Sequence, residues 1–123
     1  VSLHPQLTPE TRHLMSDAQF ALMKETAFVI NTARGPVIDE AALVRALRAK
    51  QIAGAGLDVF EFEPQVSSEL VAMPNVVLTP HLGSGVLELR EGMANVVVDN
   101  TIALIEGRSP VSCLNPQVLK KLF

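Results

Sequence analysis

The sequence predicts an α/β fold, half of a doubly wound parallel sheet, followed by a long helix and a tail. Short apolar runs with strand character alternate with helical patterns along the chain. The runs at residues 27–30 and 76–78 are unbroken apolar segments, as expected for strands that are buried on both faces. Polar residues directly follow several of these runs, at the ends of strands where open α/β sheets bind their ligands.

The amino-terminal segment predicts one strand end and two short helices. Residues 1–4 resemble the tail of a strand and lack an initiator methionine, so we expect the chain to be part of a longer protein. Pro9 after Thr8 is a favourable helix start and predicts a short helix. Ser16 predicts a second helix of one or two turns, with Phe20 facing inward.

The middle of the chain predicts an amphipathic helix from Asp39 to about Lys50, because Leu43 and Leu47 share one face and the basic residues lie on the other. The other elements predicted here are a small apolar strand at 53–59, a loop at 60–73 with one helical turn near 68–72, and the strand at 76–78.

A long helix is predicted over residues 86–106, where Gly107 ends it. The tail that follows has a last apolar turn at 118–123. We therefore predict two parts: residues 1–85 as half of a doubly wound domain, and residues 86–123 as a long helix and a carboxyl-terminal segment.

The composition narrows the range of partners. The chain has 123 residues, 48% of them hydrophobic, a formal net charge of -3 and a pI near 5.5, and its basic residues are scattered. These values argue against binding to nucleic acid or to an anionic membrane. No apolar run reaches the ~20 residues of a membrane span, and no signal peptide is visible. The single cysteine, Cys113, allows no internal disulfide and no cysteine-ligated zinc site, so we predict an ordinary packed thiol and a cytoplasmic protein.

Five residues near the strand ends have side chains that are suited to catalysis or ligand binding: Arg34, Asp58, Glu61, Glu63 and His81. A carboxylate that accepts a hydrogen bond from His81 would favour the imidazolium form, which suits a general acid near neutral pH. Arg34 offers a planar fork that matches a substrate carboxylate.

Each of these residues also has an ordinary structural explanation. A histidine after a strand is usually a loop or capping residue, and an arginine before a glycine is usually a solvated turn residue. Asp58 would serve equally well as a turn cap, and we expect one of Glu61 and Glu63 to be merely solvated. Their shared position at strand ends is what favours a functional site.

Four stretches carry a resemblance that covers nearly the whole chain. They read SLHPQLTPETRHL, MKETAFVINTARGPVIDEAALVRAL, IAGAGLDVFEFEP and NVVLTPHLGS. They resemble the carboxyl half of the D-isomer-specific 2-hydroxyacid dehydrogenases, and most closely the branch of glyoxylate, hydroxypyruvate and 2-ketogluconate reductases. The resemblance implies an oxidoreductase that transfers hydride between NAD(P)H and a small 2-keto or 2-hydroxy acid. It also implies that residues 1–85 are the second, carboxyl-terminal half of a doubly wound, Rossmann-like NAD(P)-binding domain, and that residues 86–123 are a long helix and a carboxyl-terminal segment that would return to the substrate domain.

The resemblance also implies roles for the candidate catalytic residues. Arg34, in the N-x-x-R-G motif, would bind the carboxylate and keto oxygen of the substrate. Glu63, in the E-P motif, would pair with the catalytic histidine, and Glu61 would not. His81 would protonate the keto oxygen as hydride arrives and would remove that proton in the reverse direction. His4 and His13 match no catalytic position and are expected to be structural.

Four further residues would contact the cofactor, either NAD or NADP. By resemblance, Asp58 would hold the nicotinamide carboxamide, Thr32 and Gly83 would line the nicotinamide pocket, and Gln6 would lie beside the adenosine. No metal site is expected. A homodimer is the expected assembly.

The chain departs from the family in lacking the G-x-G-x-x-G turn that binds the pyrophosphate and the residue that selects NAD or NADP. The glycine pairs at 54–56 and 83–85 lack the third glycine. We therefore expect the isolated chain to bind cofactor weakly and to be inactive. An alternative is a truncated, catalytically silent fragment that self-associates through its sheet edge or serves as a binding module.

Overall fold

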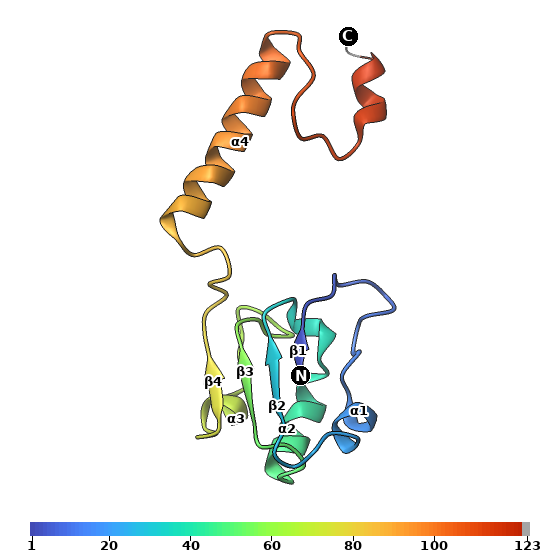
Figure 1. Cartoon of the computed structure of the whole chain (residues 1–123), viewed down its shortest axis with the longest axis vertical. Helices are drawn as coiled ribbons and strands as arrows, with labels where there is room; N and C mark the ends of the chain where they lie inside the picture. Colours follow the sequence, from blue (N-terminus) through green and yellow to red (C-terminus); the bar gives the residue numbers. More distant parts are fainter. Residues whose placement is uncertain (122–123) are drawn as a thin grey trace. The chain divides into compact units, whose positions relative to one another are not determined.

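The computed structural model describes residues 1–121 and contains two compact units, Val1–Gly83 and the part from Ser84 onward. The first unit holds a sheet of four parallel strands in chain order (Figure 1). The strands are β1 (Ser2–Leu3), β2 (Phe28–Asn31), β3 (Gly54–Leu57) and β4 (Val76–Leu78). The predicted α/β class with a parallel sheet is confirmed. Because the strands run in one direction, their carboxyl ends meet at one edge of the sheet.

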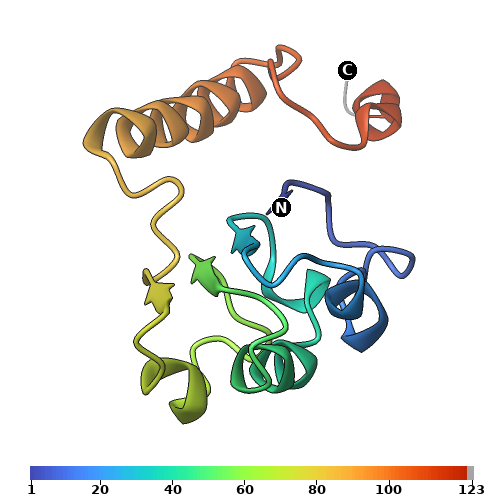
Figure 2. The same ribbon diagram turned by 60° about the horizontal axis from the view of Figure 1, so that its bottom comes forward.

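Three helices cover one face of this sheet: α1 (Asp17–Ala21), α2 (Glu40–Arg48) and α3 (Ser68–Val71) (Figure 2). A short 3-10 turn, Gly35–Val37, joins β2 to the segment before α2. Consecutive crossovers that advance in the same direction across the sheet place their helices on the same face, since parallel crossovers are right-handed.

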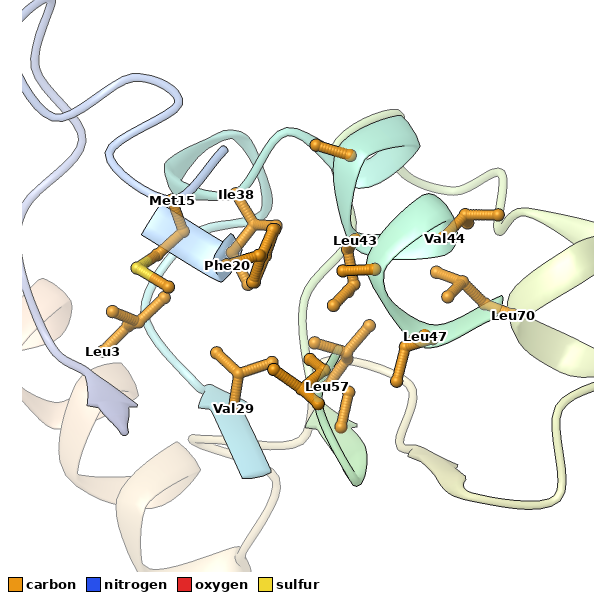
Figure 3. Close-up of a cluster of buried hydrophobic side chains, with 14 of the residues drawn as sticks. Leu3, Met15, Phe20, Val29, Ile38, Leu43, Val44, Leu47, Leu57 and Leu70 are labelled. Carbon is orange, nitrogen blue, oxygen red and sulfur yellow. The ribbon is translucent and has the colours of Figure 1, made fainter. Parts of the chain in front are cut away.

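The hydrophobic core lies between the sheet and these helices (Figure 3). Phe20 of α1, Val29 of β2 and Leu43 of α2 are almost completely buried there. Leu57 of β3 and Leu70 of α3 extend the core toward the other end of the sheet. The predicted inward face of α2 is thus confirmed.

The opposite face of the sheet is partly open, so the prediction that β2 is buried on both faces is wrong. Phe28 is 55% exposed and Ile30 is 37% exposed, and both lie on the face away from the helices. A Cβ atom added at Gly54 would lie 2.8 Å from the ring of Phe28, and one added at Gly56 would lie 2.9 Å from Cδ1 of Ile30. At Gly54 the carbonyl oxygen of Asn75 would be closer still, at 2.4 Å, so that position requires glycine. The strand is apolar, as predicted, but within this unit only one of its faces is covered by helices.

The helix predicted to start at Thr8 is wrong. The segment forms turns instead, because Thr11 uses its hydroxyl to bind the nearby backbone: Thr11 Oγ1 donates to the carbonyl of Gln6 (2.6 Å) and accepts from the N–H of Thr8 (2.7 Å). Such side-chain bonds compete with helical ones. His13, with a φ of 54°, then turns the chain toward α1.

The second unit consists of the predicted long helix, α4 (Leu87–Ile105), and a carboxyl-terminal 3-10 turn, Pro116–Lys121. Gly107 adopts a φ of 69°, and the N–H of Arg108 donates to the carbonyl of Ala103 (2.7 Å), which confirms the predicted glycine stop. The apolar turn predicted at 118–123 falls partly within the 3-10 turn, and residues 122 and 123 lie outside the described residues. Cys113, predicted to be packed, is partly exposed.

Among residues 1–121, no helix is both long enough and apolar enough to cross a lipid bilayer.

Candidate active site

The candidate residues after β2, β3 and β4 lie at the carboxyl edge of the sheet. Thr32 and Arg34 follow β2, Asp58 follows β3, and His81 follows β4. This edge is where parallel sheets bind ligands, because the loops that leave the strands open there.

His81 and Glu63 form a hydrogen-bonded pair. Nδ1 of His81 lies 2.9 Å from Oε2 of Glu63, while Oε1 of Glu63 accepts the N–H of Phe60 (2.9 Å). The bond from His81, with a smaller contribution from the Phe60 N–H, holds the pKa of Glu63 below its usual value. An ionised carboxylate can only accept hydrogen bonds, so Nδ1 of His81 carries the proton and Nε2 is available to another molecule.

The exposed side of this pair borders a pocket of about 400 Å³. The His81 side chain is 48% exposed and that of Glu63 is 35% exposed. The remaining lining is largely apolar and comes from Phe60, Pro64, Val66 and Pro80. A small molecule can therefore reach the imidazole from solvent.

Asp58 organises the backbone of the loop that carries His81. Its Oδ1 accepts the hydroxyl of Thr79 (2.5 Å) and the N–H of Leu82 (2.8 Å), and its Oδ2 accepts the N–H of Gly83 (3.0 Å). The Leu82 bond and then the Thr79 bond hold the pKa of Asp58 below its usual value. His81 itself has a φ of 54°, and its N–H donates to the carbonyl of Asp58 (2.9 Å).

Asp58 has acceptor capacity beyond these three bonds. A carboxylate offers about four acceptor positions. Three are filled by donors of the chain, which leaves one on Oδ2, next to Gly83. That position can accept one further N–H or O–H donor.

Arg34 is presented by a loop that the buried amide of Asn31 shapes. Nδ2 of Asn31 donates to the carbonyl of Arg34 (3.0 Å), and its Oδ1 accepts the N–H of Ala33 (3.1 Å). A Cβ at Gly35 would lie 1.8 Å from the carbonyl oxygen of Phe60, so only glycine fits there. The Asn and Gly of N-x-x-R-G thus hold the loop, and the Arg34 side chain remains exposed.

Gln6, Thr32 and Arg34 line a second, more polar cleft of about 530 Å³. The Nη1 of Arg34 donates to the carbonyl of Ala33 (2.6 Å). Among residues 1–121, no hydrogen bond or ion pair joins Arg34 to Glu63 or His81. The candidate residues thus lie at one edge of the sheet in three groups. These are the His81–Glu63 pair, the loop that Asp58 holds, and the separate loop that carries Arg34.

The expectation that one of Glu61 and Glu63 is merely solvated is wrong, because both carboxylates are hydrogen-bonded. The Glu61 side chain is only 5% exposed, and its carboxylate meets Arg12 and His13. The sequence carries no local signal for these contacts, since the partners lie 48 and 49 residues away. Among the described residues, no cluster of His, Cys, Asp and Glu is arranged to hold a metal ion.

Comparison with known proteins adds three similarities. Glyoxylate/hydroxypyruvate reductase B of Serratia proteamaculans is 54% identical over 116 residues, which are 94% of this chain and 36% of the relative. An NADPH-dependent glyoxylate/hydroxypyruvate reductase from Sinorhizobium meliloti, solved in complex with NADP and malonate, has a TM-score of 0.81 and 40% identity, covering 85% of this chain and 33% of that one. D-lactate dehydrogenase from Lactobacillus jensenii, solved with NAD+, has a TM-score of 0.82 and 36% identity, covering 92% and 38%.

The chain thus spans only about a third of the length of these relatives. A family model described as "D-isomer specific 2-hydroxyacid dehydrogenase, NAD binding domain" matches residues 1–83, which are the residues of the first compact unit. The chain therefore belongs to the family of D-isomer-specific 2-hydroxyacid dehydrogenases.

Proposed function

We propose that this chain forms the catalytic segment of an NAD(P)H-dependent reductase of small 2-keto acids such as glyoxylate or hydroxypyruvate. The observation that carries the proposal is the bond of 2.9 Å between His81 and the ionised Glu63, at the same sheet edge as Arg34. The named activities of the relatives from Serratia proteamaculans and Sinorhizobium meliloti support it.

The proposed chemistry assigns one task to each residue. NADH or NADPH, when bound, would supply the hydride to the keto carbon. His81, protonated on both nitrogens, donates the Nε2 proton to the keto oxygen, and Glu63 stabilises the imidazolium before that transfer. Arg34 binds the substrate carboxylate with its guanidinium fork and orients the keto group. In the reverse direction, Nε2 of neutral His81 takes the proton from the hydroxyl group.

We assign the cofactor contacts to Thr32, Asp58, Gly83 and Gln6. The free acceptor position on Asp58 Oδ2 and the polar cleft beside Gln6 and Thr32 support this assignment. In a polypeptide of reductase length, residues 1–85 would complete the NAD(P)-binding domain, and residues 86–123 would return to a substrate domain. We also propose that the protein forms a homodimer, which is consistent with the exposed apolar side chains of α4. We propose a cytoplasmic location, which is consistent with the single free cysteine.

The test uses the full-length protein, with oxidation of NADPH or NADH measured in the presence of glyoxylate or hydroxypyruvate. We expect His81→Ala to lower kcat by at least about 10²–10⁴-fold, the usual contribution of a general acid. The dissociation constant of the cofactor should stay near the wild-type value, because His81 belongs to the keto-acid side of the site. Arg34→Lys should instead raise the KM for the keto acid. Full activity of the His81→Ala protein would refute the proposal.

A further inference from the structure

Glu61 has an environment unlike that of its neighbours in the loop after β3. Its side chain is only 5% exposed, whereas the adjacent Phe62 is an exposed residue. Oε1 accepts from Nη2 of Arg12 (3.1 Å) and lies 2.6 Å from Nε2 of His13. Oε2 accepts the N–H of Glu40 (3.1 Å). All these partners are protein groups, so the carboxylate is held from three directions.

The contact with α2 is reciprocal. The N–H of Glu61 donates to Oε2 of Glu40 (3.1 Å), while the carboxylate of Glu61 accepts the N–H of Glu40. Glu40 is the first residue of α2, where backbone N–H groups lack intrahelical partners and the helix dipole favours a negative charge. Two hydrogen bonds therefore fix the loop after β3 to the start of this helix.

The same contacts reach the segment that carries Arg34. The N–H of His13 donates to the carbonyl of Pro36 (2.8 Å), just after the Arg34-Gly35 pair. On the other side, the carbonyl of Phe60 is packed against Gly35. Phe60 and His13, the two neighbours of Glu61 in these contacts, thus meet the arginine loop at Gly35 and Pro36.

The contacts also reach the histidine pair. Phe60 precedes Glu61 and donates its N–H to Oε1 of Glu63, which binds His81 through its other oxygen (2.9 Å each). A displacement of Glu61 would consequently move Phe60 relative to both Gly35 and Glu63. Since no hydrogen bond joins Arg34 to His81 among the described residues, their separation depends on such shared supports.

We propose that Glu61 is a positioning residue for the keto-acid site, which sets the distance and angle between Arg34 and the Glu63–His81 pair. This inference rests on the proposed function. Glu61 would not touch the substrate; it acts through Phe60, Glu40 and His13. Buried ion pairs add little net stability compared with apolar packing, which agrees with a role in geometry.

The test compares Glu61→Gln with Glu69→Gln in the full-length protein. Glutamine keeps the size of residue 61, but its amide nitrogen cannot accept one of the three bonds. Glu69 is a matched control, because its carboxylate pairs with Arg48 (3.2 Å) on the surface, away from the site. With saturating NADPH, we expect Glu61→Gln to lower kcat/KM for glyoxylate by on the order of tenfold to a hundredfold, through a raised KM together with a lowered kcat, and to leave the dissociation constant for NADPH unchanged. Glu69→Gln should match the wild type.

A merely structural role predicts a different result. Partial unfolding of the Glu61→Gln protein would lower kcat through loss of active enzyme and would leave KM unchanged. That outcome would overturn the inference. If the wild-type protein reduces no keto acid, the proposed function fails, and amide hydrogen exchange decides the inference separately. We expect faster exchange at residues 34–38 and 60–63 together in Glu61→Gln, and unchanged exchange there would refute it.

Discussion

At the scale of the residue, Asp58 shows how one carboxylate can define a catalytic loop. Its three accepted bonds span residues 79–83, so the backbone of His81 is fixed on both sides. The left-handed φ of His81 is disfavoured for a residue with a side chain, and these bonds compensate for it. The position of the imidazole therefore depends on a neighbouring strand end.

Replacing Asp58 with asparagine tests this dependence through pH. The amide cannot accept all three bonds, so we expect the free energy of unfolding near pH 7 to fall by about 1–3 kcal/mol. The folded pKa of Asp58 is lowered, so its contribution is present above the unfolded pKa of about 4 and is lost as pH falls through the folded pKa. The difference between the two proteins should thus shrink only below about pH 4. Urea unfolding followed by circular dichroism measures it, and a gap that is constant down to acid would contradict the prediction.

Residue-scale prediction from the sequence succeeded where a motif is contiguous and failed where contacts are distant. The pairing of Glu63 with His81 was expected, and the structure has that bond. The burial of Glu61 was missed, because Arg12 and His13 reach it from a loop that was itself predicted as a helix. The helix predicted from Thr8 does not form because the Thr11 hydroxyl binds nearby backbone groups instead. Whether a hydroxyl makes such bonds depends on local geometry, which the amino-acid sequence does not specify directly.

At the scale of the element, α2 connects the two loops of the site. It begins directly after the arginine loop, and its first residue binds the loop after β3. The side chain of its N-cap, Asp39, accepts the N–H of Ala42 (3.0 Å). The first turn of α2 is therefore fixed both by its own N-cap and by the loop after β3.

The N-caps of α2 and α3 differ in geometry, so we expect their removal to have different effects on stability. We expect Asp39→Ala to destabilise the protein by about 0.5–2 kcal/mol, the usual effect of losing an N-cap. Ser67→Ala, at the cap of the four-residue α3, removes a longer bond (3.3 Å) at an exposed site and should have a smaller effect. Thermal unfolding of both variants measures the difference. Equal losses of stability in the two variants would contradict this prediction.

The elements themselves were largely predictable. The strands and helices within residues 27–106 follow from apolar runs and helical periodicity, and their observed bounds lie within a few residues of those expected. The burial of β2 on both faces was not predictable, because periodicity does not tell how many faces of a sheet this chain covers. Phe28 and Ile30 are apolar but partly exposed.

At the scale of the whole molecule, the chain contains the candidate catalytic residues but not the phosphate-binding turn. The proposed nicotinamide and keto-acid contacts lie within residues 31–83, whereas no G-x-G-x-x-G sequence occurs in the 123 residues. In dinucleotide-binding folds, that turn supplies backbone N–H groups to the pyrophosphate. Most of the binding energy for the cofactor should accordingly come from outside this chain.

A titration of the isolated chain tests this expectation. We expect the 123-residue chain to bind NADPH weakly, with a dissociation constant well above the micromolar range, and the full-length protein to bind much more tightly. The fluorescence of NADPH reports binding, and circular dichroism first verifies that the isolated chain is folded. Submicromolar affinity of the isolated chain would contradict the prediction.

The order of the strands determines which loops are neighbours. Because β1 to β4 lie in the same order in space as in sequence, the loops that follow β2, β3 and β4 are adjacent at the carboxyl edge of the sheet. Arg34, Glu63 and His81 come from these three loops in turn. An insertion in any one of the loops would therefore change the spacing of the proposed catalytic groups without changing the order of the strands.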